Sequence, residues 1–210
     1  MPTRDLKISP SVVRRLPIYL RHIQVLRAQG VERVSSQEMG DRLDLNPAQI
    51  RKDLASFGEF GKKGVGYEVS YLERKLRQIL NLDRNIGVAL IGAGHLGIAL
   101  SNYARFQSER MTINGLFDSD PQKIGAKIGH LIVENVAGLE TACQTRHMQI
   151  GIIAVPAIAA QGVCDALVKA QIRVILNFAP ASLRIPKGVH LRNTDFTTEL
   201  QSLAFYLADE

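Results

Sequence analysis

The stretch NIGVALIGAGHLGIALSNY, residues 85–103, decides the fold of the second half of the chain. An apolar run is followed by Gly92-x-Gly94-x-x-Gly97 and then by an amphipathic segment. A strand, a glycine-rich turn and a helix in this order are typical of the first unit of a dinucleotide-binding fold. The three glycines alone are weak support, so the interpretation depends on the residues around them.

The next segment supplies the acidic residue that such a fold uses. MTINGLFD, residues 111–118, is typical of a second strand and ends on Asp118, 21 residues beyond Gly97. A carboxylate there accepts hydrogen bonds from the adenosine ribose and repels a 2′-phosphate, which favours NAD(H) over NADP(H). We expect Gly92 to permit the tight turn and Gly94 to admit the pyrophosphate at the helix N-terminus. Gly97 lets the helix pack on the sheet.

Strands and helices keep alternating after this point. QIGIIAVP (149–156), AAQGVCDALVKAQ (159–171), IRVILNFAP (172–180) and the run around VHLRN (189–193) follow one another. This alternation predicts a parallel sheet and therefore an α/β fold. The loops 154–157 and 177–181 open at the ligand-binding edge of that sheet, and they hold apolar and amide side chains.

Three helices are predicted in the first 57 residues, and a fourth, YLERKLRQIL (71–80), leads to the glycine motif. Residues 9–30 place apolar side chains at helical spacing, with Pro17 as a possible start or bend and Gly30 as the end. SSQEMGDRL (35–43) begins with a capping box of Ser35 and Glu38. PAQIRKDLASF (47–57) follows the cap residue Asn46. The apolar sets of these helices are Val12, Leu16, Leu20, Ile23 and Leu26; Met39 and Leu43; and Ile50, Leu54 and Phe57.

Two short helices joined by a tight break form the helix-turn-helix pattern, whose second helix enters the major groove of DNA. Gln49 and Arg51 lie in the first turns of that helix and suit adenine and guanine edges, whereas Lys52 suits phosphate. The alternative interpretation of these helices is a small helical bundle with a charged face. GEFGKKGVGYEVS (58–70) favours DNA binding, because it predicts a glycine-tipped basic hairpin with Lys62 and Lys63 near its turn.

The net charge is concentrated in the same part of the chain. Residues 1–82 hold 15 Lys and Arg against 9 Asp and Glu, a net charge of +6, whereas residues 83–210 hold 11 against 11. A local basic surplus is typical of a protein that binds a polyanion, although a solvated basic surface has the same composition.

Other classes of protein fit the sequence less well. Tyr71-x-x-x-Lys75 resembles the catalytic pair of short-chain dehydrogenases, but it precedes the glycine motif, whereas that pair follows the fourth strand. Residues 194–210 are too few for a substrate domain. We therefore expect that the protein is not an enzyme. No apolar run approaches the roughly 20 residues of a membrane span, and residues 1–15 lack a signal-peptide core, so we expect the cytoplasm. Cys143 and Cys164 are expected to be reduced, part-buried thiols, not a disulfide or metal site.

Residues 195–210 form the last predicted element. Leu200, Leu203 and Leu207 with Phe205 and Tyr206 give an amphipathic helix with a wide apolar stripe. This helix can pack on its own domain or on a second subunit, as in swapped dimers.

Taken together, these residues resemble the Rex family of bacterial redox-sensing transcriptional repressors. The resemblance covers nearly the whole chain, and its most specific segments are RRLPIYLR (14–21), QIRKDLASFGEFGKKGVGY (49–67), IGAGHLGIALSNYARF (91–106), FDSDPQKIG (117–125) and TDFTTELQSLAFYL (194–207). It implies a winged-helix DNA-binding domain at 1–82, a Rossmann-like NAD(H)-binding domain at 83–194 and a C-terminal helix at 195–210 that is swapped in a homodimer.

The resemblance also implies a function. The homodimer binds double-stranded, palindromic operators of anaerobic and fermentative genes. NADH acts as an effector, not as a co-substrate, and its binding releases the homodimer from DNA. NAD+ competes weakly with NADH and permits repression. The DNA contacts are expected from Ser35, Ser36, Gln49, Arg51, Lys52, Lys62, Lys63 and Tyr67. The cofactor contacts are expected from Gly92, Ala93, Gly94, His95, Leu96, Gly97, Asp118, Val155, Pro156 and Phe196, the last from the other subunit. An inter-subunit polar switch is expected from Arg15, Tyr103 and Asp195.

Two alternatives stay open: an NAD-dependent dehydrogenase with a basic tail, and a nucleotide- or CoA-binding interaction module. Asp118 argues against CoA, whose adenosine ribose lacks the free 3′-hydroxyl that NAD offers.

Overall fold

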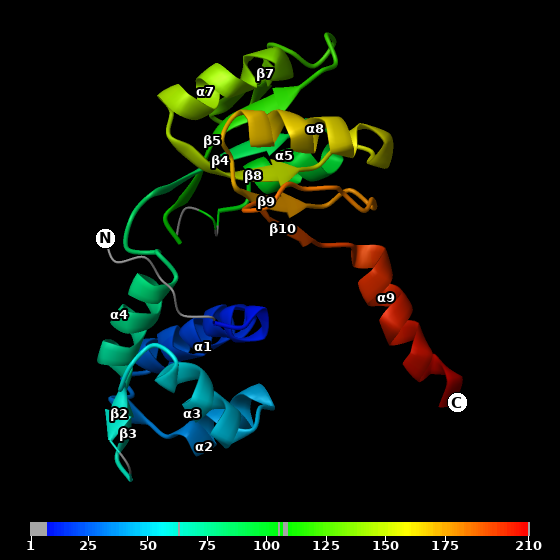
Figure 1. Cartoon of the computed structure of the whole chain (residues 1–210). Coiled ribbons are helices and arrows are strands. Elements are labelled where there is room, and N and C mark those ends of the chain that lie inside the picture. Colours follow the sequence, from blue (N-terminus) through cyan, green and yellow to red (C-terminus); the bar gives the residue numbers. More distant parts are fainter. Residues whose placement is uncertain (1–7, 63, 105, 107–108, 210) are drawn as a thin grey trace. The chain divides into compact units, whose positions relative to one another are not determined.

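The computed structural model of the chain describes residues 8–62, 64–104, 106 and 109–209. Its contacts divide the chain into an N-terminal unit, residues 1–84, and a C-terminal unit, residues 85–210 (Figure 1). The N-terminal unit contains helices α1 (Pro10–Ala28), α2 (Ser36–Leu43), α3 (Pro47–Ala55) and α4 (Val69–Ile79). It also contains strands β1 (Arg33–Val34), β2 (Gly61–Lys62) and β3 (Gly66–Glu68), which form an antiparallel sheet in the order β1-β3-β2.

The helix ends follow the local sequence signals. The Ser35 hydroxyl accepts from the amide of Glu38 at 3.1 Å, and the Glu38 carboxylate accepts from the Ser35 amide at 2.6 Å, so the predicted capping box is confirmed. Asn46 caps α3 through the Ala48 amide at 2.8 Å, ahead of Pro47. Asp44, between α2 and α3, has a φ of 53° and turns the chain in the left-handed region. The helix-turn-helix and the hairpin after it are therefore confirmed as a winged helix.

Two details of α1 and α3 differ from the prediction. Helix α1 does not begin at Pro17: it begins at Pro10 with Ser9 as its cap, and the exposed Pro17 lies within it. Phe57 is only half-buried, because α3 ends at Ala55 and the helical phase is lost beyond it. The buried apolar side chains of this unit include Leu16, Tyr19, Leu20, Ile23, Met39, Ile50, Leu54, Leu72 and Leu76.

The C-terminal unit is built on a seven-stranded sheet in the order β10-β9-β8-β4-β5-β7-β6. The neighbouring strands are parallel except for β6, which pairs antiparallel with β7. The strands are β4 (Ile86–Ile91), β5 (Met111–Asp118), β6 (Lys127–Ile128), β7 (Leu131–Asn135), β8 (Met148–Ile153), β9 (Val174–Asn177) and β10 (His190–Asn193). The helices are α5 (His95–Ser101), η1 (Val136–Gly138), α7 (Leu139–Thr145), α8 (Ala157–Lys169), α9 (Phe196–Ala204) and η2 (Phe205–Asp209).

Helices cover both faces of this sheet (Figure 1). On one face Ala89 and Ile91 of β4 pack in a cluster with α7 and α8, which contribute Cys143 and Cys164 among others. On the other face Val88 and Leu90 pack in a second cluster, against which Leu100 of α5 lies. Burial on both sides explains the unbroken apolar run of β4. The α/β parallel-sheet prediction is confirmed.

Both cysteines are free and buried, and burial raises the pKa of each thiol. Both thiols are unpaired, and they are more deeply buried than the part-buried positions predicted, with exposed fractions of 3% and 0%. Among the described helices, none is long and apolar enough to cross a membrane.

The apolar stripe of the C-terminal segment is exposed in the single chain. The exposed fractions of Leu200, Leu203 and Leu207 are 67%, 60% and 77%. Phe205 and Tyr206 of η2 are exposed as well and pack edge-to-face on each other. Docking of this stripe on a second subunit stays a prediction.

Candidate nucleic-acid interface and cofactor site

An open groove of about 1320 Å³ lies between the hairpin and helices α2 and α3 of the N-terminal unit. Ser35, Ser36, Arg51 and Tyr67 line it, so the fold brings four of the predicted DNA-binding residues together. Arg33 of β1 also lines it, a basic residue that the sequence analysis did not select. Its guanidinium and hydroxyl groups suit a phosphate backbone, and the carboxylates of Glu38 and Glu59 line the same groove.

The groove residues are held in different ways. Arg51 is exposed and donates a hydrogen bond of 2.8 Å from its guanidinium to the Ser36 hydroxyl. Lys52 is exposed on the next position of α3. Tyr67 is 9% exposed, and burial raises the pKa of its phenol, so its ring serves mainly to pack the hairpin. Lys63 lies outside the described residues, and only the backbone of Lys62, in β2, is described.

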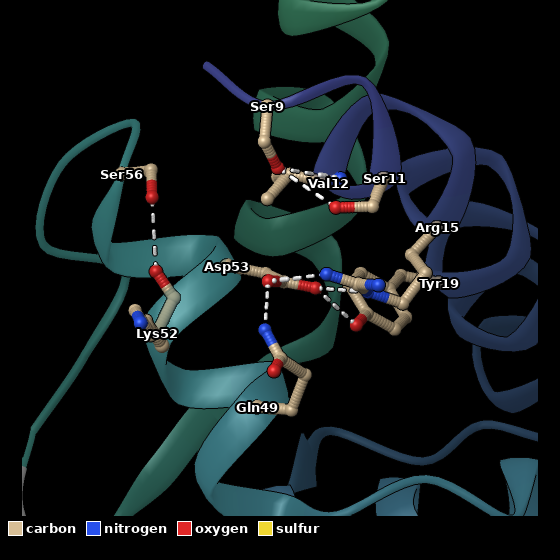
Figure 2. A network of polar contacts seen from close by, with 9 residues as sticks. All are labelled: Ser9, Ser11, Val12, Arg15, Tyr19, Gln49, Lys52, Asp53 and Ser56. Atoms are coloured by element: carbon tan, nitrogen blue, oxygen red, sulfur yellow. Dashed lines mark hydrogen bonds and ion pairs between the residues drawn. The ribbon is translucent and has the colours of Figure 1, made fainter. Parts of the chain in front are cut away.

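Gln49 and Arg15 belong to a network that the sequence did not reveal (Figure 2). Asp53 of α3 is buried and forms a bidentate ion pair with Arg15 of α1, at 2.6 and 2.9 Å. The same carboxylate accepts from the Tyr19 hydroxyl at 2.7 Å and from the Gln49 amide nitrogen at 2.6 Å. The signal that could have found Asp53 is a charge three residues after Ile50, on the buried face of α3.

The electrostatics of this network follow from its contacts. Burial by itself would raise the pKa of Asp53, but the hydrogen bonds from Arg15, Tyr19 and Gln49 outweigh it and lower that pKa. Burial and the hydrogen bond to Asp53 raise the pKa of Tyr19. Asp53 is therefore a carboxylate, and Tyr19 a neutral donor, at neutral pH.

The candidate cofactor site lies at the carboxyl edge of the sheet in the C-terminal unit. Strand β4 is flanked by β5 and β8, the point at which the strand order reverses and where open parallel sheets bind their ligands. The loops after β4 and β8 meet there, because the Ala154 amide donates to the Ile91 carbonyl at 2.8 Å. A Cβ built on Gly92 would lie 3.0 Å from the Val155 side chain. The fold thus brings Val155, followed by Pro156, beside the glycine motif.

Each glycine of the motif has a distinct steric reason. Gly92 has a φ of 109°, the left-handed region that side chains rarely adopt. A Cβ on Gly97 would collide with the Gly92 carbonyl oxygen, so α5 touches the turn directly. A Cβ on Gly94 would meet no atom within 4 Å, which leaves open space above the start of α5. No side chain caps α5, so the first backbone amides, those of His95 and Leu96, lie at this space.

Asp118 ends β5 beside the motif and is 9% exposed. It accepts from the Ala93 amide at 2.8 Å, from the Asp120 amide at 2.9 Å and from the Lys123 ammonium at 3.2 Å. Burial would raise its pKa, but these donors outweigh burial and lower it. Lys123, which also lies 3.7 Å from Asp120, was not selected from the sequence, and it places a cation next to the acidic residue.

The loop after β9 is held by another residue that the sequence did not single out. Asn177 is fully buried and donates to the Ala179 carbonyl and to the Asn193 side chain, both at 3.0 Å. The next residue, Phe178, stacks on Phe196 of α9 with the ring centroids 6.0 Å apart. Phe196 is 60% exposed, so most of its surface is available for a further contact.

Each residue of the predicted switch has a partner within its own unit. Arg15 pairs with Asp53, Tyr103 is half exposed and packs edge-to-face on Phe106, and Asp195 caps α9 through the Thr197 amide at 2.9 Å. The Tyr71–Lys75 pair lies on α4 of the N-terminal unit, with the Lys75 ammonium 5.7 Å from the centre of the Tyr71 ring. It is thus in the other unit from the glycine motif.

A winged helix followed by a dinucleotide-binding fold defines a class of DNA-binding regulators that respond to a nucleotide. Family models match both parts of the chain: "Putative DNA-binding protein N-terminus" over residues 7–55 and "CoA binding domain" over residues 83–181. The redox-sensing transcriptional repressor Rex of Brevibacillus brevis is 53% identical over 201 residues, covering 96% of this chain and 97% of the relative. That of Chloroflexus aggregans is 45% identical, covering 95% and 94%. The chain belongs to the Rex family of redox-sensing transcriptional repressors.

Solved structures agree with this assignment. RSP, described as a Rex-family repressor, has been solved in complex with beta-NAD+ and operator DNA. In that complex the RSP chain is 38% identical in sequence to this chain and superposes with a TM-score of 0.90. The match covers 95% of this chain and 92% of RSP. RSP in complex with beta-NADH is 35% identical with a TM-score of 0.86, covering 96% and 94%. The family's members are named repressors, which confirms the prediction that the chain is a regulator and not a dehydrogenase.

Proposed function

We propose that this chain is a repressor that binds operator DNA through its winged helix and NAD(H) through its C-terminal unit, and that NADH lowers its affinity for DNA. The observation that carries this is the presence, in one chain, of the groove at α2, α3 and the hairpin, lined by Arg33 and Arg51, and of the glycine motif closed by Asp118. The relative RSP has structures with NAD+ and operator DNA and with NADH, which supports the same pair of ligands here.

DNA is bound by the residues of the groove and by those that flank it. Arg51 reads a guanine edge after exchanging its contact with Ser36, and Gln49 reads adenine. Lys52, Lys62 and Lys63 bind phosphate, with Ser35, Ser36 and Tyr67 at the hairpin base. Each phosphate contact releases a counterion, so affinity falls steeply as salt rises.

The C-terminal unit has the features that NAD(H) needs. The space above Gly94 admits the pyrophosphate, and the first amides of α5 donate to it. Asp118 accepts from the adenosine ribose. CoA, the ligand in the name of the matching family model, carries a phosphate on the 3′-oxygen, which this carboxylate repels.

The redox state is distinguished at the nicotinamide, because the adenosine and pyrophosphate contacts are common to NAD+ and NADH. The oxidised ring is charged and the reduced ring is neutral, so an apolar, aromatic pocket penalises the cation through desolvation. Val155, Pro156 and Phe196 supply such a pocket, Phe196 from the second subunit.

The regulated species is a homodimer in the cytoplasm, bound to a palindromic operator. The exposed apolar stripe of α9 and η2 packs on the second subunit, as a swapped terminal helix. Arg15, Tyr103 and Asp195 change partners across the dimer between the DNA-bound and NADH-bound states. To change the populations of two conformations from 1:99 to 99:1, a ligand must bind one conformation about 5.5 kcal/mol more tightly than the other. A ligand that binds both conformations equally shifts neither population.

A gel shift with palindromic DNA, repeated with NADH and with NAD+, tests the proposal. We expect NADH to release the duplex and NAD+ to leave it bound. Occupancy of the C-terminal unit by NADH without any change in DNA affinity would contradict the proposal, and turnover of NADH with a small carbonyl would support a dehydrogenase instead.

A further inference from the structure

The network around Asp53 joins two residues to which the proposed function gives separate tasks. Arg15 belongs to the predicted inter-subunit switch, and Gln49 to the base-reading turns of α3. Both donate to the same buried carboxylate (Figure 2). We propose that Asp53 is a positioning residue that holds Gln49 for base reading and couples it to Arg15.

The hydrogen-bonding capacity of Asp53 is fully used. Its Oδ2 accepts from the Arg15 Nε and the Tyr19 hydroxyl, and its Oδ1 accepts from an Arg15 terminal nitrogen and the Gln49 Nε2. A carboxylate offers about four acceptor positions, so none remains for a further donor. A change at any one of the three partners therefore alters the contacts of the other two.

This arrangement sets the orientation of the Gln49 amide. A carboxylate only accepts, so the amide nitrogen must face Asp53. The amide keeps one N–H and its carbonyl oxygen, the donor and acceptor that a bidentate contact with adenine requires. Gln49 is half-buried, and a fixed side chain loses less rotamer freedom on binding than a free one.

Arg15 gives the contact a regulatory consequence. It supplies the positive charge opposite the buried Asp53 carboxylate, and 21% of its own side-chain surface is exposed. If Arg15 turns towards a carboxylate of the second subunit, Asp53 keeps only Tyr19 and Gln49 as donors. A buried charge without its cation is costly, so Gln49 is then drawn more strongly to Asp53 and away from the base.

The test uses the full chain and a duplex that the wild-type chain selects from a randomised palindromic pool. Affinities are measured for that duplex and its single-base variants. We expect Gln49→Ala to lose preference at one symmetry-related base pair. We expect Asp53→Asn to lower the ratio of affinities for the preferred and the substituted base pair at the same position by about fivefold or more. A change of this size corresponds to the loss of one net hydrogen bond. The double variant loses no more there than Gln49→Ala alone.

The second readout is the ratio of duplex affinities without and with saturating NADH. We expect Asp53→Asn to reduce this ratio. The matched control is Glu73→Gln, which breaks the ion pair of Glu73 with Arg27. That ion pair also involves α1, but it connects α1 to α4 and not to α3. This control keeps both the base preference and the NADH ratio.

The proposal is overturned if Asp53→Asn lowers the affinity for all duplexes by the same factor, or if its effect on base preference adds to that of Gln49→Ala. It is also overturned if Asp53→Asn leaves the ratio of duplex affinities without and with NADH unchanged. Should Asp53→Asn fail to fold, Tyr19→Phe removes a single donor, and an unaltered preference at the Gln49 base pair then overturns it. The inference rests on the proposed function, but the two fail in different experiments. A wild-type chain that shows no base preference would refute the proposed function itself, whereas the outcomes named above for the variants refute only the role of Asp53.

Discussion

The two units of this chain build their candidate sites from different parts of the polypeptide. The groove of the N-terminal unit is lined by side chains such as Arg51 and Tyr67, and Gln49 beside it is held by a buried carboxylate. The site of the C-terminal unit is built largely from backbone, with glycines where a Cβ would collide or would fill the open space. Asp118 is its main charged side chain, and it too accepts from two backbone amides.

This difference determines how each unit responds to substitution. A backbone-built site fails when one added methyl group changes the path of the chain, because packed backbone has no alternative position. A side-chain-built site loses one contact at a time, so its substitutions change affinity or specificity in steps. Substitutions in the two units therefore test this contrast.

The largest effect is expected at Gly97. Gly97→Ala places a Cβ against the Gly92 carbonyl, and overpacking of this kind costs about 1–3 kcal/mol of stability. We expect the C-terminal unit to melt at a lower temperature and NADH affinity to fall by roughly 100-fold or more.

Gly94→Ala is the matched control for Gly97→Ala. Its φ of −84° suits alanine and its Cβ meets no atom, so stability stays unchanged while NADH binding is lost. Calorimetry and thermal melting measure the two quantities. Wild-type NADH affinity in both variants would place the pyrophosphate elsewhere.

A smaller effect is expected for the charged side chain of the same site. Asp118→Asn removes a charged acceptor from the ribose, a loss of about 1.5–3 kcal/mol for NADH, and it removes the repulsion of a 2′-phosphate. Titration with NADH and NADPH should therefore show the two affinities converging. Lys123→Met, which removes the neighbouring cation, should instead sharpen the preference for NADH. Unchanged discrimination in Asp118→Asn would remove Asp118 from the ribose contact.

In the N-terminal unit we expect stepwise losses. Arg51→Ala should cost about 1–3 kcal/mol against the base pair that it reads and should relax preference there. Lys62→Ala or Lys63→Ala should weaken all duplexes alike and reduce the salt slope by about one. Binding of single-base variants over a range of salt concentrations separates the two classes. An unaltered preference in Arg51→Ala would refute its base-reading role.

Phe196 tests whether side chains also tune the backbone-built site. Phe196→Ala should weaken NADH by about 0.5–1.5 kcal/mol, and NAD+ by less, because an aromatic contact favours the neutral ring. Phe205→Ala, further along the C-terminal segment, should leave the ratio of the two affinities unchanged. Equal losses for NADH and NAD+ in calorimetry would count against the proposed position of Phe196.

The smallest effect is expected at the start of α2. Ser35→Ala removes the capping box and should lower the unfolding free energy by about 0.5–1 kcal/mol in chemical denaturation. Ser56→Ala removes only an exposed bond to the Lys52 carbonyl and should change stability less. A Ser35→Ala variant as stable as the wild type would show that the cap is dispensable.

The secondary-structure elements and the kind of ligand expected for each unit could be predicted from the sequence. Local signals such as the capping box of Ser35, the Asn46 cap and the spacing of Gly92, Gly94 and Gly97 act over a few residues, so they can be recognised without tertiary contacts. The concentration of positive charge in residues 1–82 is likewise a property of composition.

The side-chain contacts that hold the two sites, by contrast, became visible only in the folded chain. Asp53 pairs with Arg15, 38 residues away in the sequence, and Lys123 reaches Asp118 from the turn after β5. Asn177 is satisfied partly by Asn193 on the neighbouring strand. Such contacts depend on how turns, helices and strands pack, and the type of a charged or amide residue does not identify its partner, because burial and pairing arise only in the folded chain.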